Sequence, residues 1–261
     1  MTRPRALVTG ASTGIGAAIA ARLVATGHDL VVAALDPDIH RVAAELARDG
    51  AAVTPVQVDL REPAEVEALY AAATAGAPLD VAVLNAGVGV GGGTFVETSL
   101  SGHLDVVRLN VASTVQLAGL VAAGMAQRRA GRLLITSSLV AAVAGPYQTT
   151  YNASKAFLAN FAEGLRYELR ASGVTVTTLL PGPVDTGFFA LAGMSDTLLG
   201  RMPKESPDLV ADQAVRGLLA GRPSVVGGRF ISRPAAVLFT VLPRTVRTRV
   251  QAAISRPPRR I

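Results

Sequence analysis

The 261-residue chain contains no cysteine and no tryptophan. The lack of cysteine excludes disulfides, thiolate nucleophiles and zinc sites built on sulfur, and it fits a reducing compartment. Histidine is scarce, and His28, His40 and His103 show no metal-ligand spacing. We therefore expect no metal site.

Long uninterrupted apolar runs are also missing, although 50% of the residues are hydrophobic. The apolar run at 235–242 lies between two prolines and falls well short of the roughly 20 residues that span a bilayer. The chain starts directly with a strand-like segment, without a charged leader or a signal-peptide core. We therefore expect a cytoplasmic protein that is not an integral membrane protein.

Acidic residues are missing from the last part of the chain. No Asp or Glu follows Asp212, whereas ten arginines do, so the net charge of +6 is concentrated near the C-terminus. Such a segment can be a solvated or subunit-covering tail, or it can contact an anionic membrane surface. Nucleic acid is not expected as a partner, because no zinc-finger, helix-turn-helix or RNA-binding aromatic motif accompanies the arginines.

Short β-branched runs alternate with longer Ala- and Leu-rich segments, which predicts βαβ units. With right-handed crossovers they give one α/β domain over residues 1–230, a doubly wound (Rossmann) seven-stranded parallel sheet with helices on both faces. A basic amphipathic extension follows at 231–261. The expected strands are 6–9, 30–34, 53–58, 81–84, 133–136, 174–180 and 224–226. The expected helices lie near 15–26, 38–48, 62–75, 97–129 with a break, 150–171 and 206–220.

A glycine-rich loop, Thr9-Gly-Ala-Ser-Thr-Gly-Ile-Gly16, follows the first expected strand and opens the first expected helix. Gly10 permits a tight turn, Gly14 lets the backbone approach a pyrophosphate, and Gly16 lets the helix pack close to the strand. The helix N-terminus adds N–H donors. In this context the loop predicts a phosphate cradle, the alternative being a glycine turn without a ligand.

Tyr151 and Lys155 are four residues apart in an expected helix, so their side chains share one face. The chain has only two lysines and four tyrosines, which makes a chance pairing at this spacing improbable. A phenol has an ordinary pKa of about 10, and a nearby ammonium lowers that pKa toward the neutral range. Tyr151 is therefore the first candidate for acid/base catalysis.

These motifs, together with Asn85-Ala86-Gly87, Asn110, Ser138 and Pro181-Gly182-x-x-x-Thr186, resemble the short-chain dehydrogenase/reductase family over residues 5–227. The motifs occur in the family's order and at compatible separations. The three-residue gap between Gly10 and Gly14 is similar to that of the simple alcohol and ketone oxidoreductase branch.

The resemblance implies four catalytic residues. Tyr151 would exchange a proton with the substrate oxygen, and Lys155 would hold the nicotinamide ribose and lower the pKa of the phenol. Ser138, favoured over its neighbour Ser137, would hydrogen-bond the substrate oxygen. Asn110 would anchor a water behind Lys155, or else act as a local hydrogen-bonding residue.

The resemblance also implies a nicotinamide dinucleotide cofactor. Asp59 would accept a hydrogen bond from the adenine amino group, with the alternative that it caps the following helix. The segment 85–87 would border the adenosine ribose, and 181–186 the nicotinamide. The cofactor-binding candidates are Thr9, Gly10, Ser12, Thr13, Gly14, Ile15, Gly16, Leu35, Asp36, Asp59, Leu60, Asn85, Ala86, Gly87, Tyr151, Lys155, Pro181, Gly182, Val184 and Thr186.

The residues after the second expected strand bear on the choice of cofactor. Leu35 stands where the family often has an acid that binds the ribose 2′-OH, and Asp36 follows it. Neither position offers a cation for a 2′-phosphate, and we expect Arg41 to pair with Asp38 or Glu45. The expectation is that NAD(H) is favoured over NADP(H).

Two further segments have an unusual composition. Residues 186–203 are too apolar for a solvent-exposed loop, which indicates a substrate lid or ordinary helix packing. Gln148 is the one polar group expected on the pocket wall before Tyr151. In the tail, Val246, Val250 and Ile254 recur at helical spacing and can cover a subunit interface, close over the active site or lie on a membrane.

We therefore predict an NAD(P)-dependent oxidoreductase that interconverts an apolar secondary alcohol and its ketone, assembled as a homodimer or homotetramer. A reductase of 3-oxoacyl thioesters is an alternative, because a basic rim would receive an acidic acyl carrier. A catalytically idle dinucleotide sensor or scaffold is a third possibility. The presence of Ser138, Tyr151 and Lys155 together argues against that last function.

Overall fold

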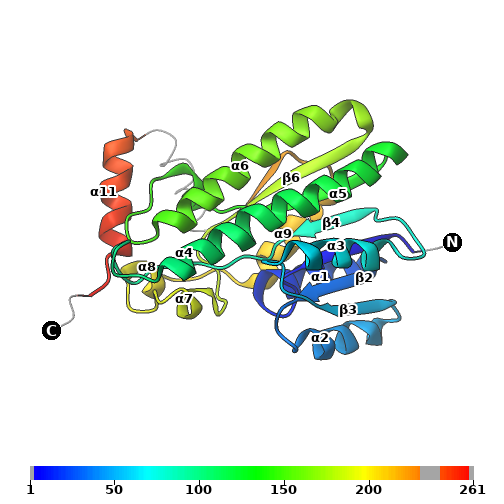
Figure 1. Cartoon of the computed structure of the whole chain (residues 1–261), viewed down its shortest axis with the longest axis horizontal. Coiled ribbons are helices and arrows are strands. Elements are labelled where there is room, and N and C mark those ends of the chain that lie inside the picture. Colours follow the sequence, from blue (N-terminus) through cyan, green and yellow to red (C-terminus); the bar gives the residue numbers. More distant parts are fainter. Residues whose placement is uncertain (1–2, 230–241, 259–261) are drawn as a thin grey trace.

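The computed structural model describes residues 3–229 and 242–258, so most of the apolar run at 235–242 lies outside the described residues (Figure 1). Seven parallel strands form one sheet in the order β3-β2-β1-β4-β5-β6-β7. The predicted doubly wound sheet is therefore confirmed. The strands are β1 (Arg5–Thr9), β2 (Asp29–Ala34), β3 (Val53–Gln57), β4 (Val81–Leu84), β5 (Gly131–Thr136), β6 (Val174–Pro181) and β7 (Ser224–Gly227).

Helices cover both faces of this sheet, and successive residues of one strand pack into the hydrophobic cores on opposite faces. Ala6 and Val8 face the side covered by α1 (Gly14–Ala25), α2 (Ile39–Leu46) and α9 (Pro207–Leu219). Leu7 faces the side covered by α3 (Pro63–Thr74), α5 (Ser113–Arg128) and α6 (Thr149–Leu169). A strand buried on both faces must be apolar throughout, which explains the uniform hydrophobicity of the strands.

The break expected within 97–129 is a change of helix type. A short helix, α4 (Leu100–Val106), passes through a π-helical segment, η2 (Val107–Ala112), into α5. The continuous helix Leu100–Arg128 is long and apolar enough to cross a membrane by length and composition. However, α5 buries Leu117, Val121 and Met125 against the sheet, as a core helix does.

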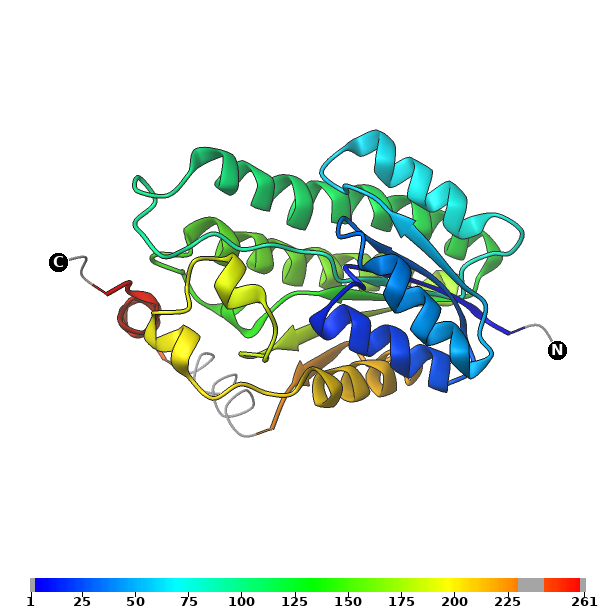
Figure 2. The same ribbon diagram turned by 90° about the horizontal axis from the view of Figure 1, so that it is seen from below.

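Several elements lie beyond the carboxyl ends of the strands. The segment expected as a lid contains two short helices, α7 (Phe188–Leu191) and α8 (Leu198–Arg201). The C-terminal helix α11 (Arg244–Ser255) packs against α8. Figures 1 and 2 show these three helices gathered at one end of the sheet, with α11 (red) beside the yellow lid segment. Ligands of open α/β sheets bind at this end.

Candidate functional site

The glycine loop after β1 makes a close-packed cradle. A Cβ atom on Gly16 would collide with the carbonyl oxygen of Gly10, so only glycine allows α1 to start this near to β1. Gly14 has a φ of +58°, which favours glycine, and a Cβ there would lie 2.8 Å from Cγ2 of Thr186. Bare backbone therefore lines the N-terminus of α1, where N–H groups can receive a phosphate.

The remaining loop residues divide between solvent and core. Ser12 is half-buried and Thr13 is exposed, whereas Ile15 packs against the core on the α1 side. This division leaves Ser12 and Thr13 accessible to a ligand at the loop and gives Ile15 a packing role.

Hydrogen bonds join the loop to the ends of β4 and β5. Oγ1 of Thr9 accepts from the backbone N–H of Asn85 at 3.0 Å and of Ala86 at 3.1 Å. The amide of Asn85 donates to the carbonyls of Thr9 and Gly10, and its oxygen accepts from Thr136. Thr9 and Asn85 thus fix the cradle to the neighbouring strands.

Lys155 reaches the end of β5 from α6. Its side chain is buried, with 5% exposure, and Nζ donates to the carbonyl oxygen of Thr136 at 2.9 Å. Burial lowers the pKa of Lys155 to about 8. An ammonium has three donors, so two remain after the Thr136 bond for ligand hydroxyls. The neighbouring Ser137 donates to the carbonyl oxygen of Lys155 at 2.6 Å, which ties α6 to β5 and gives Ser137 a supporting position.

Tyr151 lies one turn before Lys155, as its spacing predicts, yet its pKa moves in the opposite direction from the expectation. Burial raises the pKa of Tyr151 to about 12, while a hydrogen bond with Ser138 opposes that rise. Nζ of Lys155 is 5.7 Å from the centroid of the Tyr151 ring. The expected lowering of the pKa by Lys155 is therefore wrong for the chain alone, because desolvation of the phenolate outweighs the hydrogen bond.

Asn110 is fully buried in the π-helical segment. Its Oδ1 accepts from the N–H of Val88, and its Nδ2 donates to the carbonyl of Val88 and to Ser154. A Cβ on Gly87 would lie 3.1 Å from Oδ1 of Asn110 and 3.4 Å from Nζ of Lys155. Asn110 and Lys155 therefore border the same backbone at Gly87, and π-helical segments often occur at functional sites.

The end of β6 completes the site. Ser138 donates to the carbonyl oxygen of Pro181 at 3.3 Å. Gly182 follows directly, Val184 is buried and bridges to Glu205, and Thr186 reaches Gly14. The structure thus brings the 181–186 segment between the glycine loop and Ser138.

Asp59 has a partner that the sequence did not reveal. Both carboxylate oxygens accept hydrogen bonds from Arg61, which also reaches Asp105 at 3.1 Å. Arg61 holds the pKa of Asp59 below its usual range. The alternative of a helix cap is wrong, because Glu62 is the N-cap residue of α3 and no side chain caps that end. Leu60 between them is buried in the core on the α3 side.

The residues after β2 are exposed. Leu35 has 55% exposure, and Oδ1 of Asp36 accepts from the backbone N–H of Asp38 at 3.0 Å. Arg41 pairs with Asp38 at 2.8 Å and with Glu45 at 2.9 Å, as predicted. The guanidinium of Arg41 is therefore already engaged on α2.

The apolar segment 186–203 packs over Tyr151. The ring centroids of Phe188 and Tyr151 are 5.0 Å apart. Phe188 also fits against Gly89, where a Cβ would lie 2.6 Å from Cζ of Phe188. Phe188, Phe189 and Met202 surround a small buried cluster formed by Ala192, Met194 and Leu199. An apolar wall thus stands beside the phenol.

Sequence reasoning missed three contributors to this geometry: Thr136, Arg61 and Ser255. Thr136 ends β5 directly before Ser137-Ser138, a position that would have indicated its role. Arg61 holds Asp59 from two positions away and also contacts Asp105, 44 residues away, and no local pattern reveals that second contact. Gln148, expected as a polar handle for the substrate, is 2% exposed and donates to Ser255 at 2.8 Å instead.

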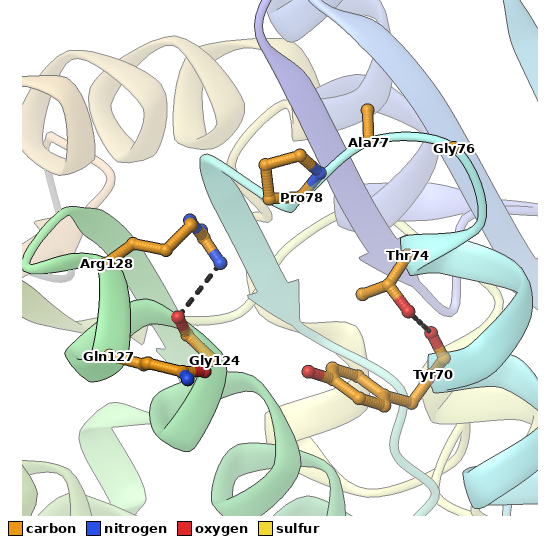
Figure 3. Close-up of a pocket in the computed structure, with 8 residues that line it drawn as sticks. All are labelled: Tyr70, Thr74, Gly76, Ala77, Pro78, Gly124, Gln127 and Arg128. Atoms are coloured by element: carbon orange, nitrogen blue, oxygen red, sulfur yellow. Dashed lines mark hydrogen bonds between the residues drawn. The ribbon is translucent and has the colours of Figure 1, made fainter.

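A surface hollow of about 390 Å³ lies at the opposite, amino-terminal edge of the sheet, between the ends of α3 and α5 (Figure 3). Arg128 donates to the carbonyls of Gly124 and Leu79, and Thr74 donates to that of Tyr70, so these polar groups are engaged by the backbone around the hollow. The hollow contains none of the candidate site residues. Its lining residues are Tyr70, Thr74, Gly76, Ala77, Pro78, Gly124, Gln127 and Arg128.

Comparison with known proteins places this site in a family. A family profile described as short chain dehydrogenase matches residues 4–194. The 1-deoxy-11-beta-hydroxypentalenate dehydrogenase of Streptomyces exfoliatus is 40% identical over 185 residues, which are 69% of this chain and 67% of that protein.

Two solved structures extend the likeness over the chain. A short-chain dehydrogenase from Sphingobium yanoikuyae in complex with NADPH has a TM-score of 0.81 and 30% identity, covering 92% of this chain and 96% of its own. A short-chain dehydrogenase/reductase from Burkholderia phymatum in complex with NAD has a TM-score of 0.82 and 26% identity, covering 99% of this chain and 98% of its own. The chain belongs to the short-chain dehydrogenase/reductase family of oxidoreductases, which act on CH–OH or C=O groups.

Proposed function

We propose that the protein interconverts an apolar secondary alcohol and its ketone with a nicotinamide dinucleotide, using Tyr151 as general acid and base. The observation that carries this proposal is the hydrogen-bonded pair of Ser138 and Tyr151 beside an apolar wall headed by Phe188. The related dehydrogenase from Streptomyces exfoliatus has a hydroxylated compound in its name, which supports an alcohol as the substrate class.

The residues fit the cofactor that this chemistry requires. The bare backbone of the glycine loop would hold the pyrophosphate, and the two remaining donors of Lys155 would hold the nicotinamide ribose. When bound, the reduced nicotinamide supplies a hydride. The adenine would lie near Asp59 and Leu60, with Arg61 fixing the orientation of the carboxylate.

Tyr151 would give its proton to the substrate oxygen during reduction. A pKa raised to about 12 keeps the phenol protonated at neutral pH, which suits a donor. Ser138 would donate to the same oxygen and share the charge that develops there. Asn110 would support a water-filled proton path behind Lys155, since both border Gly87.

A panel of carbonyl compounds tests the substrate class. We expect apolar cyclic and aromatic ketones to give a kcat/KM at least tenfold higher than hydroxylated ketones of the same size, because the wall beside Tyr151 is aromatic and aliphatic. Nicotinamide absorbance follows the reaction. A preference for 3-oxoacyl groups on an acyl carrier would favour the alternative reductase, and no turnover with any carbonyl would favour the sensor.

The cofactor preference is a separate proposal in favour of NAD(H). Leu35 and Asp36 are exposed after β2, and Arg41 is paired with two carboxylates, so none of these three residues offers a free cation to a 2′-phosphate. We expect Leu35→Arg combined with Asp36→Arg to shift the ratio of kcat/KM values toward NADP(H) by tenfold or more. The matched control is Arg41→Ala, which should change the ratio less than twofold. A native tenfold preference for NADP(H) would contradict the proposal.

A homodimer or homotetramer is proposed on the basis of exposed apolar side chains. Leu100, Leu104 and Val107 on the α4–η2 segment and Phe157 on α6 are each at least 43% exposed. Such surfaces often mark interfaces between subunits. We expect light scattering to give a mass at least twice that of one chain, and Phe157→Arg to reduce it. A monomer in the wild-type sample would overturn this expectation.

A further inference from the structure

The C-terminal helix α11 lies on the site end of its own chain. Ile254 packs against the lid cluster that contains Met194 and Leu199, and α11 lies next to α8 (Figure 2). The same cluster is flanked by Phe188, whose ring is 5.0 Å from that of Tyr151. Ile254 is thereby linked to the phenol through the lid cluster and Phe188.

A buried polar cluster fastens this helix. Oγ of Ser255 accepts from Nε2 of Gln148 at 2.8 Å and from Nε2 of Gln251 at 2.9 Å. The three side chains are 0%, 2% and 1% exposed in that order. Buried amides need hydrogen-bond partners, and Ser255 supplies one to both. The Gln251–Ser255 bond lies within α11, so the Gln148–Ser255 bond is the one that ties α11 to the start of α6.

The cluster reaches the segment that starts the catalytic helix. Gln148 is the N-cap residue of α6, three positions before Tyr151, and its carbonyl accepts from the N–H of Asn152. Tyr147 has a φ of +65°, a left-handed conformation that costs free energy outside glycine. Nε of Arg256 donates to Oη of Tyr147 at 3.2 Å, so this strained turn has a second tie to the C-terminal segment.

A further contact joins α11 to the segment after Ser138. Nη1 of Arg247 donates to the carbonyl of Ala142 at 3.0 Å, in the short helix η3 (Leu139–Ala142). The C-terminal segment thus contacts the chain after Ser138, the chain before Tyr151 and the lid. Of the apolar stripe on α11, Ile254 faces the lid, whereas Val246 and Val250 are 39% and 40% exposed.

We propose that Gln148, Gln251 and Ser255 form a latch, with Ser255 as a positioning residue that holds the 145–148 segment and the lid around Tyr151. The inference rests on the proposed function, because the latch orders the place where a carbonyl substrate meets the phenol. It assigns α11 to the active site of its own chain. It also gives Gln148 a role in docking α11 in place of substrate contact.

A double-mutant cycle tests the latch. Ser255→Ala and Gln148→Ala should each lower kcat/KM for the best ketone by about tenfold, mainly through KM, and should leave the Kd of the reduced cofactor within twofold. The double variant should be no worse than the worse single variant, since both changes break the same hydrogen bond between Gln148 and Ser255. The control is Thr248→Ala, whose hydroxyl bonds within α11 and should not affect kinetics. Additive losses, or no loss, would overturn the proposal.

Hydrogen exchange gives a readout that does not need turnover. Amides of 145–152 and 188–202 should exchange at least fivefold faster in Ser255→Ala than in the wild type or in Thr248→Ala. Unchanged exchange would overturn the latch. Faster exchange in a protein that reduces no carbonyl would support the latch and contradict the proposed function instead. If Ser255→Ala does not fold, Gln148→Met removes the donor at similar volume and provides the same comparison.

Discussion

Tyr151→Phe is expected to lower kcat for carbonyl reduction by about 10² to 10⁴, the range typical for the loss of a general acid. The substitution keeps the ring that packs against Phe188 and removes only the hydroxyl that bonds Ser138. The glycine loop lies on other elements, so the Kd of the cofactor should stay within about threefold. Steady-state kinetics and a titration of reduced cofactor fluorescence measure the two quantities.

The control for this prediction is Tyr167→Phe, because Tyr167 is 65% exposed on the same helix and stacks with Arg170. It should have wild-type activity. Near-normal turnover in Tyr151→Phe would show that another group moves the proton. The oxidation direction adds a pH test: a phenol with its pKa raised to about 12 must lose a proton to act as base, so oxidation should accelerate as pH rises above neutrality.

Lys155→Met is expected to stabilise the protein while it removes activity. The folded pKa of Lys155 is about 8 against an ordinary value of 10.5, a difference that corresponds to about 3 kcal/mol for holding this ammonium in the interior. Methionine fills a similar volume without the charge, so the free energy of unfolding at pH 7 should rise by up to that amount. Activity should fall to background, and the Kd of the cofactor should rise tenfold or more, because the ribose loses its donors.

The sign of the pH dependence provides a check on Lys155→Met. Because folding lowers the pKa of Lys155, its buried ammonium destabilises the folded state most below about pH 8. This destabilisation disappears as the pH rises toward 10.5. The stability gap between Lys155→Met and the wild type should therefore narrow over that range. Lys204→Met, at the only other lysine, is the control and should show no such trend. Equal stability of Lys155→Met and wild type at pH 7 would contradict the buried-charge account.

The strands and main helices were predictable because their signals are local. Each strand is a short β-branched run, and the glycine loop marks the passage from β1 to α1 within eight residues. The Tyr151 and Lys155 pair also depends only on helical spacing. The π-helical form of the break around Asn110 was not predictable, since an inserted residue leaves the apolar pattern almost unchanged.

The parts that could not be predicted depend on contacts between distant residues. Gln148 meets Ser255 across 107 positions, and Arg61 meets Asp105 across 44. The predicted direction of the pKa change at Tyr151 was wrong for a related reason. Spacing shows that Lys155 is near, but only the packed structure shows that its Nζ is directed to Thr136 and that burial dominates.

Transfer of deuterium from labelled cofactor tests the central claim most directly. Reduced nicotinamide dinucleotide carrying deuterium at both hydrogen positions of C4 of the ring would be incubated with the best apolar ketone, and the alcohol would be analysed by mass spectrometry. We predict one deuterium on the carbinol carbon with the wild-type protein and almost none with Tyr151→Phe in the same time. Unlabelled alcohol, or an equal yield of labelled alcohol from Tyr151→Phe, would contradict hydride transfer assisted by Tyr151.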